Sequence, residues 1–195
     1  NYSLLGDAFL EITPIKNLRI RSDIGTNLIL SEYKQFYPTW GGPIRFQNLP
    51  NSLAQSYSNN FTYNWTNTAT YNLHFGDHGI EVLLGTEAVD NAIRQISASR
   101  TTYVDQGGTF QYLDNGTLNP LNGGNESQWA LFSVFGRLNY NWQDRYLASF
   151  NFRRDGSSRL DPHDRYGNFF SGAVGWRIDK EKFMENVRNV SLLKL

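Results

Sequence analysis

Residues 129–178 alternate apolar and polar side chains in three consecutive runs. Apolar residues stand at the even positions of 130–142, 146–152 and 170–178, while polar residues such as Ser133, Arg137 and Asn151 stand between them. Because side chains of a strand point alternately to its two faces, each run predicts a strand with one apolar and one polar face. The runs are roughly 10–14 residues long, close to the ~9–11 residues that a tilted strand needs to cross a bilayer. The pattern therefore favours strands that cross a membrane.

The same alternation recurs in the first half of the chain, and the connections differ in length. Four further strands are predicted, over residues 4–13, 18–30, 60–75 and 80–89. Short turns are predicted at Pro14–Asn17, Gly76–Gly79 and Gln143–Arg145, and long irregular segments at 32–59 and 97–128. In outer-membrane barrels the short turns face the periplasm and the long loops face outside. We therefore predict an all-β fold, an antiparallel transmembrane β-barrel segment with short periplasmic turns and long extracellular loops.

The composition narrows the function classes. No run approaches the ~18 apolar residues of a spanning helix, which leaves strands as the membrane-crossing element. Charged residues make up 18% of the chain and aromatic residues 15%, the net charge is zero, and there is no cysteine. The neutral balance without a basic cluster gives no reason to expect nucleic-acid binding, and disulfides and thiolate metal sites are excluded. Since the strand pattern runs to both termini, we expect the chain to begin and stop inside a barrel.

Three segments of the second half carry a specific combination of residues. They read Phe-Gly-Arg-Leu-Asn-Tyr at 135–140, Phe-Arg-Arg-Asp-Gly-Ser-Ser-Arg at 152–159, and Gly-Trp-Arg-Ile at 175–178. Together they resemble the SusC/RagA family of TonB-dependent outer-membrane transporters. Segments 65–68 and 83–87 also resemble barrel segments of that family, so the resemblance spans nearly the whole chain.

The resemblance implies a fold, a location and partners. It implies a 22-stranded barrel in the outer membrane of a Gram-negative bacterium, filled by an N-terminal plug. Residues 1–195 would be a partial barrel domain of about seven strands, with the plug domain and the remaining strands absent. The family imports oligosaccharides, glycans or peptides under a SusD-like surface lipoprotein and draws energy from TonB through the plug. It implies outer-membrane lipid around the barrel, no cofactor and no enzymatic activity.

Aromatic residues of the long segments are the predicted contacts to cargo. An aromatic ring can stack on a sugar while neighbouring amides bond its hydroxyls. The alternative is that these rings pack the loops onto one another or onto a lid protein. The candidates are Tyr37, Trp40, Tyr57, Tyr103 and Tyr112.

Charged residues around the Gly-Ser turn after residue 155 form a second candidate group. They are a polar patch of the lumen or loop that touches cargo or, as we favour, an ion-pair network that orders the loop. Its members are Arg153, Asp155, Arg159, Asp161 and Arg165. A third group, at strand ends beside short turns, is predicted to anchor the barrel in the membrane interface. It comprises Trp142, Tyr146 and Trp176.

No catalytic or metal site is predicted. Glu81 and Glu87 lie about 20 Å apart along a strand, beyond the ~5–9.5 Å of a glycosidase pair, and we expect them to line a polar lumen. No Ser-His-Asp arrangement is present, and the three histidines lack metal-ligand spacing. A calcium site in the loop that holds Asp105 and Asp114 stays open.

Two other functions remain open at this point. One is a soluble β-sandwich that binds carbohydrate through aromatic loops, which would bury its apolar face between two sheets. The other is an outer-membrane receptor or adhesin that does not transport, which would use the same barrel.

Overall fold

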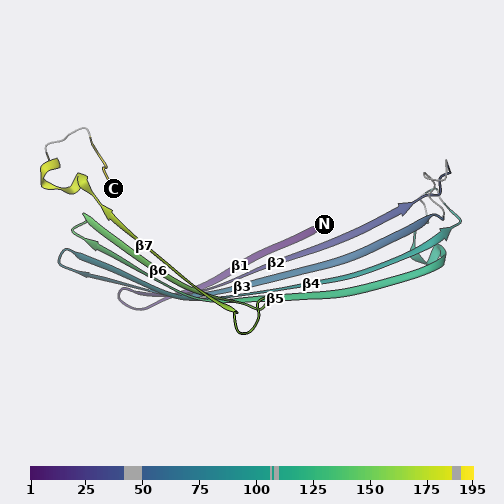
Figure 1. Cartoon of the computed structure of the whole chain (residues 1–195), viewed down its shortest axis with the longest axis horizontal. Helices are drawn as coiled ribbons and strands as arrows, with labels where there is room; N and C mark the ends of the chain where they lie inside the picture. Colours follow the sequence, from purple (N-terminus) through teal and green to yellow (C-terminus); the bar gives the residue numbers. More distant parts are fainter. Residues whose placement is uncertain (42–49, 106, 108–109, 186–189) are drawn as a thin grey trace. The chain divides into compact units, whose positions relative to one another are not determined.

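A computed structural model describes residues 1–41, 50–105, 107, 110–185 and 190–195. These residues form one seven-stranded sheet in which every strand lies beside its neighbours in sequence, in the order β1 to β7 (Figure 1). The strands are β1 (Tyr2–Ile15), β2 (Leu18–Tyr37), β3 (Ser52–Phe75), β4 (His78–Tyr103), β5 (Gly116–Trp142), β6 (Tyr146–Ser157) and β7 (Tyr166–Trp176). Short 3-10 helices are η2 (Leu113–Asn115), η3 (Ile178–Lys180) and η4 (Lys182–Met184). Within this part of the chain, no helix has the length and apolar character needed to cross a membrane.

The three predicted short turns are confirmed. They join β1 to β2, β3 to β4 and β5 to β6. Asn17, Gly76, Gln143 and Asp144 adopt positive φ there, at 70°, 55°, 55° and 54°. This left-handed conformation, which glycine and asparagine adopt most readily, reverses the chain within a few residues. Adjacent turns are also bonded to each other, since the Gln143 amide N–H donates to the Asp77 carbonyl at 2.8 Å.

The predicted long irregular segments are wrong over most of their length. Strand β2 continues to Tyr37 and β3 already begins at Ser52, while β4 runs to Tyr103 and β5 begins at Gly116. The residues added to the strands are rich in Asn, Gln, Ser and Thr, so they show no apolar alternation. An antiparallel neighbour satisfies backbone groups whatever the side chains are, and the strands extend for that reason. Residues 42–49, 106 and 108–109 of these segments lie outside the described residues.

Two compact units divide the chain. Unit 1 comprises Asn1–Gly6, Thr26–Thr62 and Asn91–Gln128, and unit 2 comprises Asp7–Gly25, Tyr63–Asp90 and Trp129–Leu195. Strands β1 to β5 contribute residues to both units, whereas β6 and β7 belong to unit 2 alone.

The register of β5, β6 and β7 fixes the two faces of unit 2. Leu138 lies opposite Phe150, which lies opposite Gly172, and the other even-numbered residues pair in the same way. The odd-numbered residues, such as Arg137 opposite Asn151, form the rows of the other face. The predicted separation of an apolar and a polar face is therefore confirmed. A slip by one residue would exchange the two faces.

The apolar face of unit 2 is not covered by a second layer within the described residues. Val174 is 88% exposed and Phe170 67% exposed. The two buried apolar side chains found among these residues, Leu53 and Tyr103, both belong to unit 1. A β-sandwich needs a second sheet packed on the first. One sheet with a bare apolar face does not fit the soluble alternative.

Candidate functional site: the polar face of unit 2

Arg153 is the centre of the polar face of unit 2. Its Nη2 donates to a carboxylate oxygen of Glu87 at 2.5 Å and to the hydroxyl of Ser133 at 2.9 Å, while its Nε donates to Asp155 at 2.6 Å. The guanidinium also lies 5.4 Å from the ring centroid of Phe135. Strands β4, β5 and β6 each supply one or more of these groups.

The β-sheet geometry explains why these side chains meet. Asp155 is two residues from Arg153 on one strand, so both point to the same face. Ser133 lies opposite Asp155 in the register of β5 and β6. The ring of Phe135 lies against Gly85, where a Cβ atom would stand 2.4 Å from the ring. A side chain at residue 85 would therefore displace this ring.

The Arg153 cluster carries a local excess of negative charge and stays in contact with solvent. One guanidinium faces the two carboxylates of Glu87 and Asp155, and the side chains of the three are 42%, 29% and 36% exposed. Charge-assisted hydrogen bonds of this kind fix side-chain geometry more strongly than neutral ones. The cluster therefore presents a rigid, polar surface that can accept hydrogen bonds from a bound molecule.

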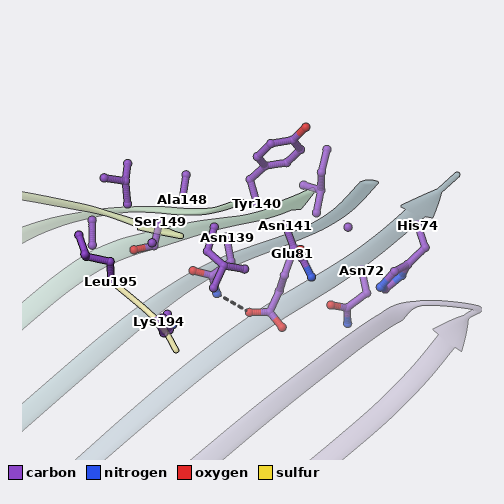
Figure 2. Close-up of a pocket in the computed structure, with 16 residues that line it drawn as sticks. Asn72, His74, Glu81, Asn139, Tyr140, Asn141, Ala148, Ser149, Lys194 and Leu195 are labelled. Atoms are coloured by element: carbon purple, nitrogen blue, oxygen red, sulfur yellow. Dashed lines mark hydrogen bonds between the residues drawn. The ribbon is translucent and has the colours of Figure 1, made fainter. Parts of the chain in front are cut away.

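A second polar group lies nearer the short turns. The Asn139 side-chain amide donates to Glu81 at 2.9 Å. Both side chains point away from the ring of Tyr140, which lies on the other side of the sheet (Figure 2). Polar side chains line a hollow of about 490 Å³ here, among them Asn72, His74, Glu81, Asn139, Asn141 and Ser149. Amides beside a carboxylate offer both donors and acceptors, as sugar hydroxyls and peptide groups require.

The chain end closes one side of this hollow. Leu195 exchanges two backbone hydrogen bonds with Trp176, of 2.9 and 3.1 Å. A Cβ atom at Gly175 would lie 3.2 Å from the side chain of Lys194, so the lysine stem lies over the β7 backbone. These two residues therefore pair antiparallel with the end of β7, at the edge of the sheet.

The opposite, apolar face gathers aromatic rings at the end beside the short turns. The ring of His78 stacks on Phe75 at 5.1 Å and on Trp142 at 6.1 Å, and Trp142 contacts Tyr146 at 5.4 Å. The predicted anchors Trp142, Tyr146 and Trp176 lie in one row across three strands. Aromatic rings with polar tips suit the boundary between lipid and water.

Glu181, which precedes η4, links the polar groups of Tyr146 and Trp176 to the segment that follows β7. It accepts hydrogen bonds from the Trp176 indole at 3.0 Å and the Tyr146 hydroxyl at 2.8 Å, and pairs with Arg145 at 3.6 Å. These bonds lower the pKa of Glu181 below its ordinary value of 4.5. A group whose pKa is lowered by folding stabilises the fold above its unfolded pKa and loses this effect as the pH falls through the folded pKa.

We therefore expect Glu181→Gln to lower the unfolding temperature of the full-length protein at pH 7, because a neutral amide replaces the charged acceptor. The difference from wild type should shrink as the pH falls from about 4.5 through the lowered pKa of folded Glu181, where the wild-type carboxylate also becomes neutral. Circular dichroism melts in detergent at several pH values measure this. Glu185→Gln, an exposed residue of the same segment, is the control. An equal deficit at all pH values would contradict the expectation.

Comparison with known proteins shows which proteins this chain is similar to in sequence. No protein-family profile matches the chain. TonB-dependent receptor P3 of Formosa agariphila is 29% identical over 191 residues, which cover 92% of the chain and 18% of that receptor. TonB-dependent receptor SusC of Bacteroides thetaiotaomicron is 50% identical over 66 residues, which cover 34% of the chain and 7% of SusC. The chain thus spans only a small part of the length of the curated relatives it matches.

Solved structures agree in fold. The RagAB peptide transporter matches with a TM-score of 0.82 at 23% identity over 92% of the chain and 20% of the matched chain. The RagAB peptide importer in the closed-closed state matches with a TM-score of 0.84 at 22% identity. The match covers 94% of this chain and 20% of the matched chain. In sequence and fold the chain is similar to a β-barrel segment of SusC/RagA-type TonB-dependent transporters. The relatives carry the names of receptors and transporters.

Within this barrel segment, the predicted cargo-contact residues do not lie together in loops. Tyr37 and Tyr103 are the last residues of β2 and β4, and Tyr57 lies inside β3. Trp40 and Tyr112 lie outside the strands. The ring of Tyr103 is buried and packs edge-on against the ring of Phe36, with 5.4 Å between the ring centroids. It is therefore not exposed to cargo. The other four rings are each between 46% and 62% exposed.

The five predicted charged residues also lie apart from one another in the structure. Arg153 and Asp155 meet, but Arg159 lies over the Trp129 ring at 5.0 Å, and Asp161 accepts the His163 amide N–H at 2.9 Å. Arg165 has a buried Nε without a hydrogen-bond partner. Among the described residues, no ion pair links the last three to the first two. The carboxylate that completes the Arg153 cluster is Glu87, from β4.

The sequence did not predict the contacts of three contributors, although Glu87 was expected to line a polar lumen. Glu87 and Ser133 occupy polar-face positions of their strands, so the alternation placed them correctly, but their pairing with Arg153 depends on a register that pattern alone does not give. Glu181 left no signal, because it follows the last strand and reaches Tyr146 across 35 positions of sequence. No group of three or more His, Asp or Glu side chains suited to a metal ion occurs in the described ranges.

Proposed function

We propose that the chain is part of the wall of an active transporter in the outer membrane of a Gram-negative bacterium. The transporter carries oligosaccharides, glycans or peptides inward. The observation that supports this most strongly is the pairing of a bare apolar face with a hydrogen-bonded polar face on one sheet of unit 2. In a barrel the first face contacts lipid and the second lines the lumen.

The height of the apolar face supports this placement. Aromatic residues mark two rows, one with Trp142, Tyr146 and Trp176 and the other with Phe132 and Tyr166. The rows are about ten residues apart along each strand, which is about 33 Å at ~3.3 Å per residue. At a strand tilt of ~40° this becomes about 25 Å, the height of the apolar band of outer-membrane barrels.

The partners of the transporter follow from the family. The curated relatives are named TonB-dependent receptors, which supports TonB as the source of energy. A SusD-like surface lipoprotein would cover the extracellular end, where Trp40, Tyr112 and the outer parts of β2 and β3 present exposed rings. On this proposal residues 1–195 are one partial barrel domain, the short turns face the periplasm and the chain has no enzymatic activity.

Sidedness and transport can be tested in the same cells. Residues 1–195 contain no cysteine, and in a full-length protein whose other cysteines are replaced, single cysteines can be placed at Lys16, in a short turn, and at Asp114, whose side chain is 93% exposed. In intact cells a membrane-impermeant maleimide should label Asp114→Cys and leave Lys16→Cys unlabelled. Both should react once the outer membrane is permeabilised. Labelling of Lys16→Cys in intact cells would overturn the orientation.

Uptake then separates transport from a receptor or adhesin. Cells with the full-length protein should accumulate labelled oligosaccharides or peptides, and a proton uncoupler or loss of TonB should stop this. Binding at the surface without accumulation would favour the receptor or adhesin and reject transport, while leaving the membrane position in place.

A further inference from the structure

One charged side chain lies on the apolar face of the β5–β6–β7 sheet. Arg154 stands between Val134 of β5 and Asn168 of β7 in the register. The rows on the short-turn side of it hold apolar residues such as Phe152 and Phe170. Arginine on a lipid-facing surface costs about 2–4 kcal/mol at the bilayer midplane and about 0–1 kcal/mol at the interface. Its placement therefore needs a physical reason.

The surroundings of Arg154 leave its guanidinium available. Cζ lies 4.8 Å from the centroid of the Tyr166 ring. This ring lies over Gly156, where a Cβ atom would stand 2.5 Å from Cε1, so a glycine makes room for it. Among the described residues no carboxylate pairs with Arg154, in contrast to Arg153 on the other face. Within the part of the chain that the structure describes, the guanidinium lies beside a ring and donates no side-chain hydrogen bond.

The depth of Arg154 indicates where these donors point. On the proposed membrane position, Arg154 is about eight residues from the row of Tyr146, or about 20 Å in height at ~40° tilt. The apolar band is about 25 Å tall, so the backbone of Arg154 lies just below its outer edge. A long side chain at this depth extends its charged end to the headgroups.

We propose that Arg154, Tyr166 and Asn168 bind the phosphate of a lipid headgroup in the outer leaflet; this rests on the proposed membrane position. A guanidinium matches two phosphate oxygens at once. The Tyr166 hydroxyl and the Asn168 amide add uncharged donors beside it. All three side chains come from the β6–β7 hairpin, and Tyr166 is 52% exposed. The lipid A of the outer leaflet carries phosphate groups of this kind.

Native mass spectrometry of the full-length protein tests the site. The protein is mixed in detergent with monophosphoryl lipid A or with its phosphate-free form, and the fraction of protein with bound lipid is measured. Wild type should prefer the phosphorylated lipid, and Arg154→Gln should lose about tenfold of this preference, since one charge-assisted contact is worth about 1.5 kcal/mol or more. Arg154→Lys should lose only part of it, because the charge remains.

Arg137→Gln is the matched control, because it removes the same side chain from the polar face. It should bind like wild type. Equal binding of both lipids by wild type, or an equal loss in Arg137→Gln, would overturn the lipid site. Failure of the membrane proposal is distinguishable, because it is read from cysteine labelling in cells and not from lipid binding.

Discussion

Gly172→Arg should destabilise the folded protein in a bilayer by about 2–4 kcal/mol. Gly172 lies opposite Phe150 near the centre of the apolar face. A Cβ atom there would have its nearest neighbour, the Ser149 carbonyl oxygen, at 3.6 Å, so the backbone leaves room for a side chain to start there. The cost therefore arises from placing a charge in hydrocarbon. Urea titration of the full-length protein in lipid vesicles should show the folded-to-unfolded ratio fall by about 30-fold to 1000-fold.

Two variants separate charge from size and backbone effects. Gly172→Leu changes the same backbone position but should be at least as stable as wild type, because leucine suits a lipid-facing surface. Ser171→Arg places the same charge on the polar face and should cost less than about 1 kcal/mol. An equal loss in Ser171→Arg and Gly172→Arg would contradict the assignment of the two faces.

Arg153→Met should lower the free energy of unfolding by about 1–2 kcal/mol. The change removes hydrogen bonds to Glu87, Asp155 and Ser133 and leaves two carboxylates without their shared cation. A hydrogen bond to a charged group contributes about 1.5–3 kcal/mol, and the partial exposure of all three charged side chains reduces this. Chemical unfolding of the full-length protein measures the loss.

Arg137→Met is the control, since Arg137 makes one exposed side-chain bond, to Asn151 at 2.9 Å. It should cost about 0–0.5 kcal/mol. A double-mutant cycle with Glu87→Gln then isolates the Arg153–Glu87 pair, and a coupling energy near zero would show that the pair does not stabilise the sheet.

Strand alternation predicts the fold of unit 2 well because the two faces meet different surroundings. At residues 131–142 and 146–152 the even-numbered apolar side chains fall on one face in the register, while Leu131, Phe135 and Leu147 fall on the polar face. In unit 1 the prediction of long irregular segments fails. Residues such as Tyr57 lie in strands there, although the residues beside them in the sequence are mostly polar. Backbone pairing supports those strands, and no period-two signal records it.

The candidate site was less predictable than the fold. The type of residue at 153 and 155 indicated ion pairing, and a pair formed. Its third member, Glu87, is 66 positions away in sequence, and only the pairing of β4 with β5 and of β5 with β6 brings it near. Arg159 and Asp161 are close in sequence but have turned out of the β6 strand, so proximity along the chain did not predict their partners.

The sequential order of the strands has a consequence for folding kinetics. Every strand pairs with its neighbour in sequence, and three of the turns are tight. Closing a short loop costs little entropy, so the β1–β2, β3–β4 and β5–β6 hairpins can form before any distant contact. The turn-to-turn bond from Gln143 to Asp77 then joins two completed hairpins. The sheet can therefore grow by adding whole hairpins, and each added hairpin covers one open edge and presents a new one.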